Sequence, residues 1–92
     1  MLYVITYDIA SPVRLRKLAK CCELYGGRVE KSVFEMRLDE PRFQRFWKEA
    51  QGLIDAEDDA LVAYRVCAAC EKEILLAGKT VRPVFETAVF IG

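Results

Sequence analysis

The segment that most constrains the fold is the amino-terminal run from Leu2 to Tyr7, which is apolar at nearly every position and rich in β-branched and aromatic residues. A strand that is apolar on both sides has to be covered on both faces of its sheet. The run therefore predicts a central strand. It ends in a carboxylate, Asp8, which is costly to bury without a partner and should lie where the burial of the strand ends.

Helix and strand signals alternate along the rest of the chain. Ser11-Pro12 is typical of a helix start, and Gly26-Gly27 ends that helix after Tyr25. Asp39-Glu40-Pro41 opens a second helix, whose buried stripe is predicted at Phe43, Phe46, Trp47, Ala50 and Ile54. We expect an acidic loop over 55–59, strands over 60–66, 72–77 and 84–91, and a turn over 78–80.

The strand-like segment from Arg28 to Leu38 changes the phase of its apolar alternation. Val29 lies on an odd position, whereas the later apolar residues lie on even ones: Phe34, Met36 and Leu38. A regular strand cannot do this without exposing one of the two sets. We therefore predict a bulge or a tight reversal near Lys31-Ser32.

Two helices interleaved with four or five strands predict an α+β sandwich of the ferredoxin-like βαββαβ kind, with an extra carboxy-terminal strand. Residues 1–92 are expected to form one domain, since 92 residues are too few for two. Two helices cover only one face of such a sheet, and 53% of the residues are hydrophobic. The other face therefore predicts a second copy of the chain in a twofold homodimer.

The formal net charge is zero, but the charges are unevenly distributed. Residues 1–48 carry ten Lys and Arg against six Asp and Glu, and residues 49–92 carry four against eight. A local basic surface can bind phosphates whatever the total charge, although an ordinary solvated face is an equally good explanation. Neither a signal peptide nor a membrane-spanning segment is visible, which predicts a cytoplasmic protein with reduced cysteines.

Asp8 is the strongest candidate for a functional residue. At the end of a central strand it could bind a hard divalent cation, which prefers oxygen ligands. One carboxylate is a poor metal site, but a homodimer with this strand near its axis would bring two Asp8 side chains together. The alternative is a loop carboxylate that caps the turn before the first helix.

Several basic residues follow Asp8 and could contact phosphates, unless they form only a solvated face: Arg14, Arg16, Lys17 and Arg28. A carboxylate that binds a metal and basic side chains that bind phosphates are the minimum set of residues for metal-assisted phosphodiester cleavage. Ser32 could add a hydroxyl and Phe34 a ring that stacks on a nucleotide, although Phe34 could equally be part of the core.

The chain contains no histidine, which excludes Ser-His, Cys-His and other histidine-based mechanisms within it. An enzyme of this composition would therefore rely on a metal to activate water. Cys67 and Cys70 have the spacing of a zinc or redox motif, but no second cysteine pair stands nearby in the sequence. Small strand-end cysteines without a ligand are the alternative.

The stretch "YVITYDIASPVRLRKLAKCCELYGGRVEKSVFEMRL" resembles the CRISPR-associated protein 2 family. Members of that family begin with a hydrophobic strand that ends in Tyr-Asp, continue with a basic helix that ends in Tyr-Gly, and follow with an Arg-Val-x-x-Ser-Val-Phe-Glu segment. "LIDAEDDALVAYRVCAAC" is similar to the acidic loop, strand and Cys-x-x-Cys ending of the family. The likeness covers nearly the whole chain and is weakest in the last fifteen residues.

The resemblance implies a ferredoxin-like homodimer in which paired Asp8 carboxylates bind Mg²⁺, or alternatively Mn²⁺. It implies an endonuclease of antiviral CRISPR adaptation that acts on single-stranded RNA or double-stranded DNA, with the CRISPR-associated integrase as a partner. Two alternatives remain at this point: a non-catalytic scaffold that holds duplex DNA for the integrase, and a toxin-like mRNA interferase of the same fold. Leu15 stands where many members have a further basic residue. The resemblance therefore implies a basic helix but not the role of each individual arginine.

Overall fold

The structure is a computed structural model that describes residues 1–77 and 89–91. Its elements follow the predicted order, with one short helix added before the last two strands. They are β1 (Leu2–Asp8), α1 (Pro12–Tyr25), β2 (Gly27–Glu30), β3 (Val33–Arg37), α2 (Glu40–Gln51), β4 (Ala60–Val66), α3 (Ala68–Glu71), β5 (Leu75–Ala77) and β6 (Val89–Ile91).

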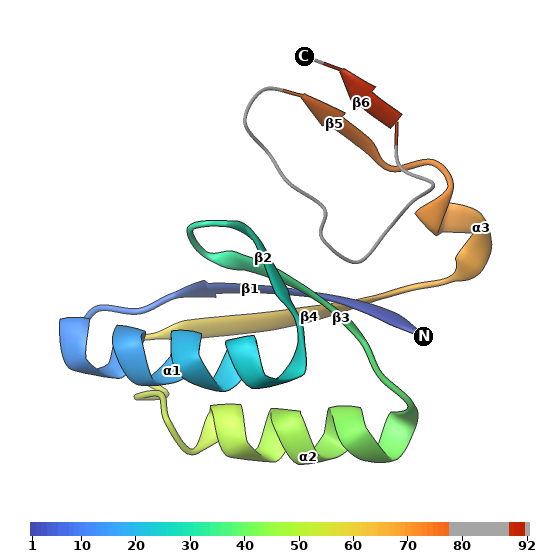
Figure 1. Cartoon of the computed structure of the whole chain (residues 1–92). Helices are drawn as coiled ribbons and strands as arrows, with labels where there is room; N and C mark the ends of the chain where they lie inside the picture. The colour runs from blue at the N-terminus through green and yellow to red at the C-terminus, as the bar shows by residue number, and fades with distance from the viewer. Residues whose placement is uncertain (78–88, 92) are drawn as a thin grey trace.

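Four strands form one sheet in the order β2-β3-β1-β4, and each neighbouring pair is antiparallel. Both α1 and α2 lie on the same face of this sheet (Figure 1). This arrangement is the predicted ferredoxin-like βαββαβ sandwich. The predicted central position of the first strand is confirmed, since β1 has a partner strand along both of its edges.

The core lies between the sheet and the two helices. The β1 residues that face the helices are Tyr3, Ile5 and Tyr7, and all three are buried. The ring of Tyr3 stacks on that of Phe43 from α2, with centroids 3.9 Å apart. Phe43, Phe46 and Ala50 of the predicted α2 stripe are buried, and Trp47 and Ile54 pack partly buried against them.

Both long helices begin as the sequence predicts. The Ser11 hydroxyl accepts the backbone N–H of Arg14 at 3.4 Å, and the Asp39 carboxylate accepts that of Arg42 at 2.9 Å. Each cap satisfies a backbone donor that has no partner inside the helix.

The end of α1 requires a glycine because the chain passes very close to β3. A Cβ atom on Gly26 would lie 2.1 Å from the carbonyl oxygen of Glu35 and 2.6 Å from the Cγ of Met36. Any larger residue at this position would push the end of the helix away from the sheet.

The phase change in the segment 28–38 has two causes. Lys31 and Ser32 form the turn that joins β2 to β3, so the tight reversal is the alternative that the structure supports. The β2–β3 register also shifts between Arg28 and Glu30. Side chains before and after the turn can therefore contact the same core although their positions differ in parity.

The carboxy-terminal part differs from the expectation in two respects. The predicted strand over 72–77 is shortened to β5, because α3 and a turn at Lys72 and Glu73 occupy the residues before it. A four-residue helix is too short to show a helical periodicity, so the sequence did not predict α3. β6 pairs with β5 in parallel at the end of the predicted strand 84–91. Residues 84–88 and the predicted turn 78–80 lie outside the described residues.

The sheet face opposite the helices carries apolar side chains that remain partly accessible. Val4 and Thr6 of β1 are half-buried there, and their β4 neighbours Val62 and Tyr64 are 39% and 57% exposed. A second copy packed against this face would bury them, but the single chain does not test the predicted homodimer. None of the helices in the described part of the chain is long and apolar enough to cross a membrane.

Candidate nucleic-acid and metal site

Asp8 is the last residue of β1 and lies opposite Ala60, the first residue of β4. Its side chain is exposed, and strand alternation places it on the same face as Val4 and Thr6, away from the helices. Among the described residues, no side chain forms a hydrogen bond or ion pair with its carboxylate. Asp8 therefore presents two oxygen atoms that a ligand could use.

The donor set of one chain is small for a metal ion. No group of three or more His, Cys, Asp or Glu side chains in the described residues could hold an ion by itself. Mg²⁺, however, commonly binds through one or two carboxylates together with waters and substrate phosphates. Asp8 fits that pattern as one ligand, and the others would come from a second copy or from the nucleic acid.

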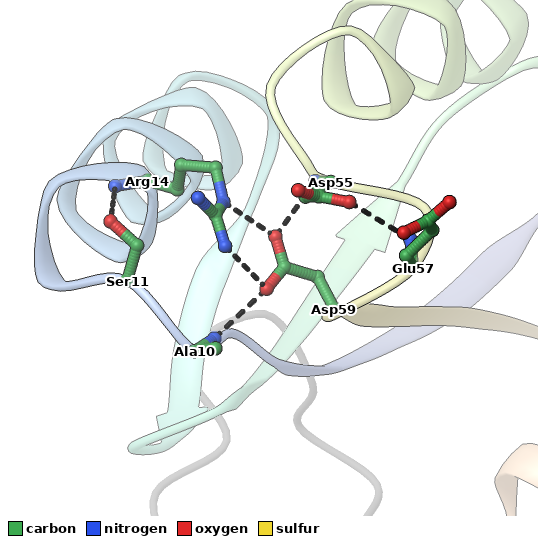
Figure 2. Close-up of polar contacts among 6 residues, drawn as sticks. All are labelled: Ala10, Ser11, Arg14, Asp55, Glu57 and Asp59. Carbon is green, nitrogen blue, oxygen red and sulfur yellow. Dashed lines mark hydrogen bonds and ion pairs between the residues drawn. The ribbon is translucent and has the colours of Figure 1, made fainter.

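Asp59 holds together the loop that follows β1, a role that the sequence did not reveal (Figure 2). Its carboxylate accepts the backbone N–H groups of Ala10 and Asp55 at 2.9 and 2.8 Å. Arg14 approaches it with two donors, Nε at 2.7 Å and an Nη at 3.1 Å. The Asp59 side chain has 0% exposure, and each of its oxygens accepts two bonds.

This Asp59–Arg14 clasp ties the start of α1 to the loop before β4. The Arg14 guanidinium, together with the two backbone donors, holds the pKa of Asp59 well below its usual range. The antiparallel register explains the contact, because Asp59 precedes the residue that pairs with Asp8. The clasp thereby fixes the segment that follows Asp8 against the loop that precedes its partner strand. Arg14, whose side chain is 31% exposed, uses two of its donors on Asp59, and its predicted contact with a phosphate stays a prediction.

A cleft of about 350 Å³ lies between α1 and the β2–β3 turn. Three of the residues predicted for the site, Arg16, Arg28 and Ser32, meet in its lining. We call this the basic cleft; its complete lining is Tyr7, Leu15, Arg16, Ala19, Arg28, Lys31 and Ser32. Lys31 is an addition to the predicted set, and it brings the number of cations around the cleft to three.

Arg28 is held in place at the rim of the basic cleft. One of its terminal nitrogens donates to the carbonyl oxygen of Lys31 at 2.6 Å, and the other lies 3.6 Å from a Glu23 oxygen. The Tyr7 hydroxyl donates to the same Lys31 carbonyl at 3.2 Å. A guanidinium has five N–H donors, so these contacts orient Arg28 and leave donors for a phosphate.

Two predicted residues lie elsewhere. Phe34 has 0% exposure and packs in the core beneath Arg28, whose guanidinium carbon is 4.8 Å from the ring centroid. This burial supports the alternative that Phe34 is part of the core, and the stacking of its ring on a nucleotide stays a prediction. Lys17 is exposed but lines a different groove of about 710 Å³ between α1 and α2, with Lys20 and Lys48 at its rim. That groove contains none of the other predicted site residues.

Asp8 and the basic cleft are neighbours in sequence but lie on different faces of the sheet. Tyr7 points toward the helices and lines the cleft, so strand alternation directs the next side chain, Asp8, to the opposite face. A single chain thus offers a basic cleft and an acidic strand end that do not converge on one point.

Comparison with known proteins gives consistent results. The family model for CRISPR associated protein Cas2 matches residues 1–74. A protein of Chloroflexus aurantiacus named "CRISPR-associated endoribonuclease Cas2 1" is 39% identical over 99% of this chain and 99% of its own length. A Rhodospirillum rubrum protein, "CRISPR-associated endoribonuclease Cas2 4", is 40% identical over 97% of this chain and 73% of its own. The crystal structure of Streptococcus pyogenes Cas2 at pH 6.5 superposes with a TM-score of 0.73 at 30% identity, covering 80% of this chain and 95% of that one.

Proposed function

Because this chain belongs to the CRISPR associated protein Cas2 family, we propose that it is a divalent-metal-dependent endonuclease of CRISPR adaptation. Its substrate would be single-stranded RNA, double-stranded DNA or both. The two relatives described above carry the name endoribonuclease, which supports a nuclease activity. The dependence on a metal is our inference from Asp8.

The basic cleft is the observation that best supports a nucleic-acid substrate. Arg16, Arg28 and Lys31 surround a space of about 350 Å³, and Arg28 is already oriented by its bond to the Lys31 carbonyl. Cations held in a fixed geometry bind phosphates with less loss of side-chain freedom than freely rotating ones. We assign Arg16, Arg28 and Lys31 to the phosphate backbone, Ser32 to a hydrogen bond at the rim, and Arg14 to positioning.

Asp8 would hold the metal. A bound Mg²⁺ or Mn²⁺ would supply Lewis-acid activation of water and neutralise charge at the phosphate. Asp8 itself would fix the position of the ion at the end of β1, and the Asp59–Arg14 clasp would keep the following loop from moving. None of the described residues that line the basic cleft is a carboxylate, so we assign the metal to Asp8 and the phosphates to the basic side chains of the cleft.

We also propose a homodimer, and the position of Asp8 on the sheet face away from the helices supports it. Packing this face against a second copy would bury Val62 and Tyr64 and would bring two Asp8 residues toward one axis. Two carboxylates make a more complete metal site than one. We further propose, from the family resemblance, that the dimer works with the CRISPR-associated integrase on duplex DNA.

A scaffold without catalytic activity is the second candidate, and one observation favours it. The basic cleft and Asp8 lie on different faces, so the cleft could hold a duplex without presenting it to Asp8. In that case spacer acquisition would survive Asp8→Ala and would fail after charge reversal at Arg16 and Arg28.

The test of the nuclease is Asp8→Ala in highly purified protein. We expect cleavage of RNA or DNA to disappear while the oligomeric state and nucleic-acid binding remain. Asp58→Ala is the matched control, because it removes an exposed carboxylate from the acidic loop without touching the Asp59–Arg14 clasp. Cleavage that persists in Asp8→Ala would overturn the catalytic proposal and leave the scaffold.

A further inference from the structure

The four cysteines form two adjacent pairs with opposite environments. Cys21 and Cys22 are buried in α1, and this burial raises their pKa to about 11 and about 12. Cys67 and Cys70 are both exposed and flank the start of α3. At neutral pH the α1 pair is almost entirely protonated, with Cys21 only 7% and Cys22 0% exposed, so it has little reactivity as a nucleophile.

Cys67 and Cys70 are placed to react with each other. The Cys67 sulfur accepts the backbone N–H of Cys70 at 3.5 Å, which brings the Cys67 side chain against the Cys70 backbone. Residues three apart at the start of a helix lie on the same side of it. The backbone N–H and then the side chain of Cys70 lower the pKa of Cys67, while the neighbouring Cys67 side chain raises the pKa of Cys70.

A metal is a poorer explanation of this pair. Zinc in a structural site takes four protein ligands, and three in a catalytic one. In the part of the chain that the structure describes, no third His, Cys, Asp or Glu joins the two cysteines in a group that could hold an ion. Two exposed cysteines on one side of a helix start, one of them with its sulfur hydrogen-bonded and easier to ionise, instead match the requirements of thiol–disulfide exchange.

We propose that Cys67 and Cys70 form a redox-active dithiol that exchanges with small-molecule disulfides such as oxidised glutathione. The Cys67 thiolate attacks one glutathione sulfur, the glutathione disulfide bond breaks, and one glutathione thiolate leaves. The Cys70 thiolate then attacks the Cys67 sulfur of the mixed disulfide and releases the second glutathione. The two protons lost by the cysteines end on the two glutathione thiols, so one disulfide is exchanged for another.

The position of the dithiol gives the exchange a structural consequence. α3 joins β4 of the main sheet to β5 (Figure 1), and Glu71, next to Cys70, forms an ion pair with Arg37 of β3. A Cys67–Cys70 disulfide would fix the turn between the sheet and β5. This site is separate from Asp8 and the basic cleft, so it stands or falls independently of the nuclease.

The first experiment is alkylation of the reduced native protein with a maleimide at near-neutral pH, followed by mass spectrometry of each cysteine peptide. The pKa of Cys21 is about 11 and that of Cys67 lies below the ordinary thiol value. The thiolate fraction of Cys67 should therefore be at least about a hundredfold larger than that of Cys21. We expect Cys67 to be labelled first and Cys21 and Cys22 only after denaturation. Equal rates at all four positions would overturn the proposal.

The second experiment incubates the native protein with oxidised glutathione. We expect an intramolecular Cys67–Cys70 disulfide in the parent chain and a stable glutathione adduct on Cys67 in Cys70→Ser. The double variant Cys21→Ser and Cys22→Ser is the matched control and should behave like the parent. A parent chain that stays reduced, or that accumulates a glutathione adduct without closing to the internal disulfide, would contradict the proposal.

Discussion

Replacing Arg16 or Arg28 by glutamine should weaken nucleic-acid binding and should also flatten its dependence on salt. Both residues line the basic cleft, and Arg28 is oriented there by its bond to the Lys31 carbonyl. A cation that contacts a phosphate releases counterions, so the logarithm of the binding constant falls linearly with the logarithm of the salt concentration. Glutamine keeps much of the side-chain length and removes only the charge.

The size of the effect follows from the number of contacts. Each phosphate contact contributes about 0.9 to the salt slope on duplex DNA and about 0.7 on a single strand. On duplex DNA, the affinity deficit of either variant should therefore shrink about 3.5-fold between about 50 and 200 mM salt. If both copies of a dimer touch the same duplex, the deficit should shrink about twelvefold over the same range.

The assay is fluorescence anisotropy with a labelled duplex and a labelled single strand at four or more salt concentrations. Arg42→Gln is the matched control, because Arg42 is exposed on α2 and lines neither groove. It should leave the slope unchanged. The interpretation of the basic cleft fails if Arg16→Gln and Arg28→Gln bind with the parental slope, or if Arg42→Gln changes the slope as much as they do.

Three further predictions concern stability and are checked by urea or thermal denaturation. Phe34→Ala should lower the free energy of unfolding by about 3–5 kcal/mol, because its ring is fully buried. The control Leu24→Ala, at a residue that is 79% exposed, should change the free energy of unfolding by less than about 0.5 kcal/mol. A Phe34→Ala variant that keeps its stability and loses only nucleic-acid binding would instead support the base-stacking role. Gly26→Ala should destabilise the fold by about 1–3 kcal/mol or more, because its Cβ would lie 2.1 Å from the carbonyl oxygen of Glu35. The control Gly52→Ala should be neutral or slightly stabilising, because its Cβ would lie 3.4 Å from the nearest atom, the carbonyl oxygen of Glu49. Equal effects of the two substitutions would refute the close approach at Gly26. The pKa of Asp59 is lower in the folded protein than in the unfolded chain, so its ion pair with Arg14 stabilises the fold fully at neutral pH. The Tm of the parent chain should therefore exceed that of Asp59→Asn at neutral pH, and this difference should shrink once the pH drops below about 4. A Tm difference that stays constant with pH would contradict the clasp.

The sequence predicted the features that depend on periodicity. The apolar run of β1 indicated a central strand, and the phase change after Val29 located the turn at Lys31 and Ser32. The caps at Ser11 and Asp39 marked both long helices. Each of these signals is local, because a few neighbouring residues suffice to set the face or the end of an element.

The features that depend on contacts between distant segments could not be predicted in this way. Arg14 and Arg16 are both basic residues of one helix, but only the antiparallel register of β1 and β4 brings Asp59 to Arg14. Arg16 points elsewhere because residues two apart on a helix do not share a face. The burial of Phe34 was likewise open, since a strand aromatic can face a core or a ligand until the sheet order is known.

If two Asp8 carboxylates share one metal ion, as we propose, the number of ions bound to each dimer is one. Mn²⁺ can be titrated into the purified protein and its free signal followed by electron paramagnetic resonance, with the oligomeric state measured on the same sample. We expect one bound ion for every two chains in a dimer, and loss of this ion in Asp8→Asn but not in Asp58→Asn. One ion for each chain, or binding that is unchanged in Asp8→Asn, would contradict this proposal.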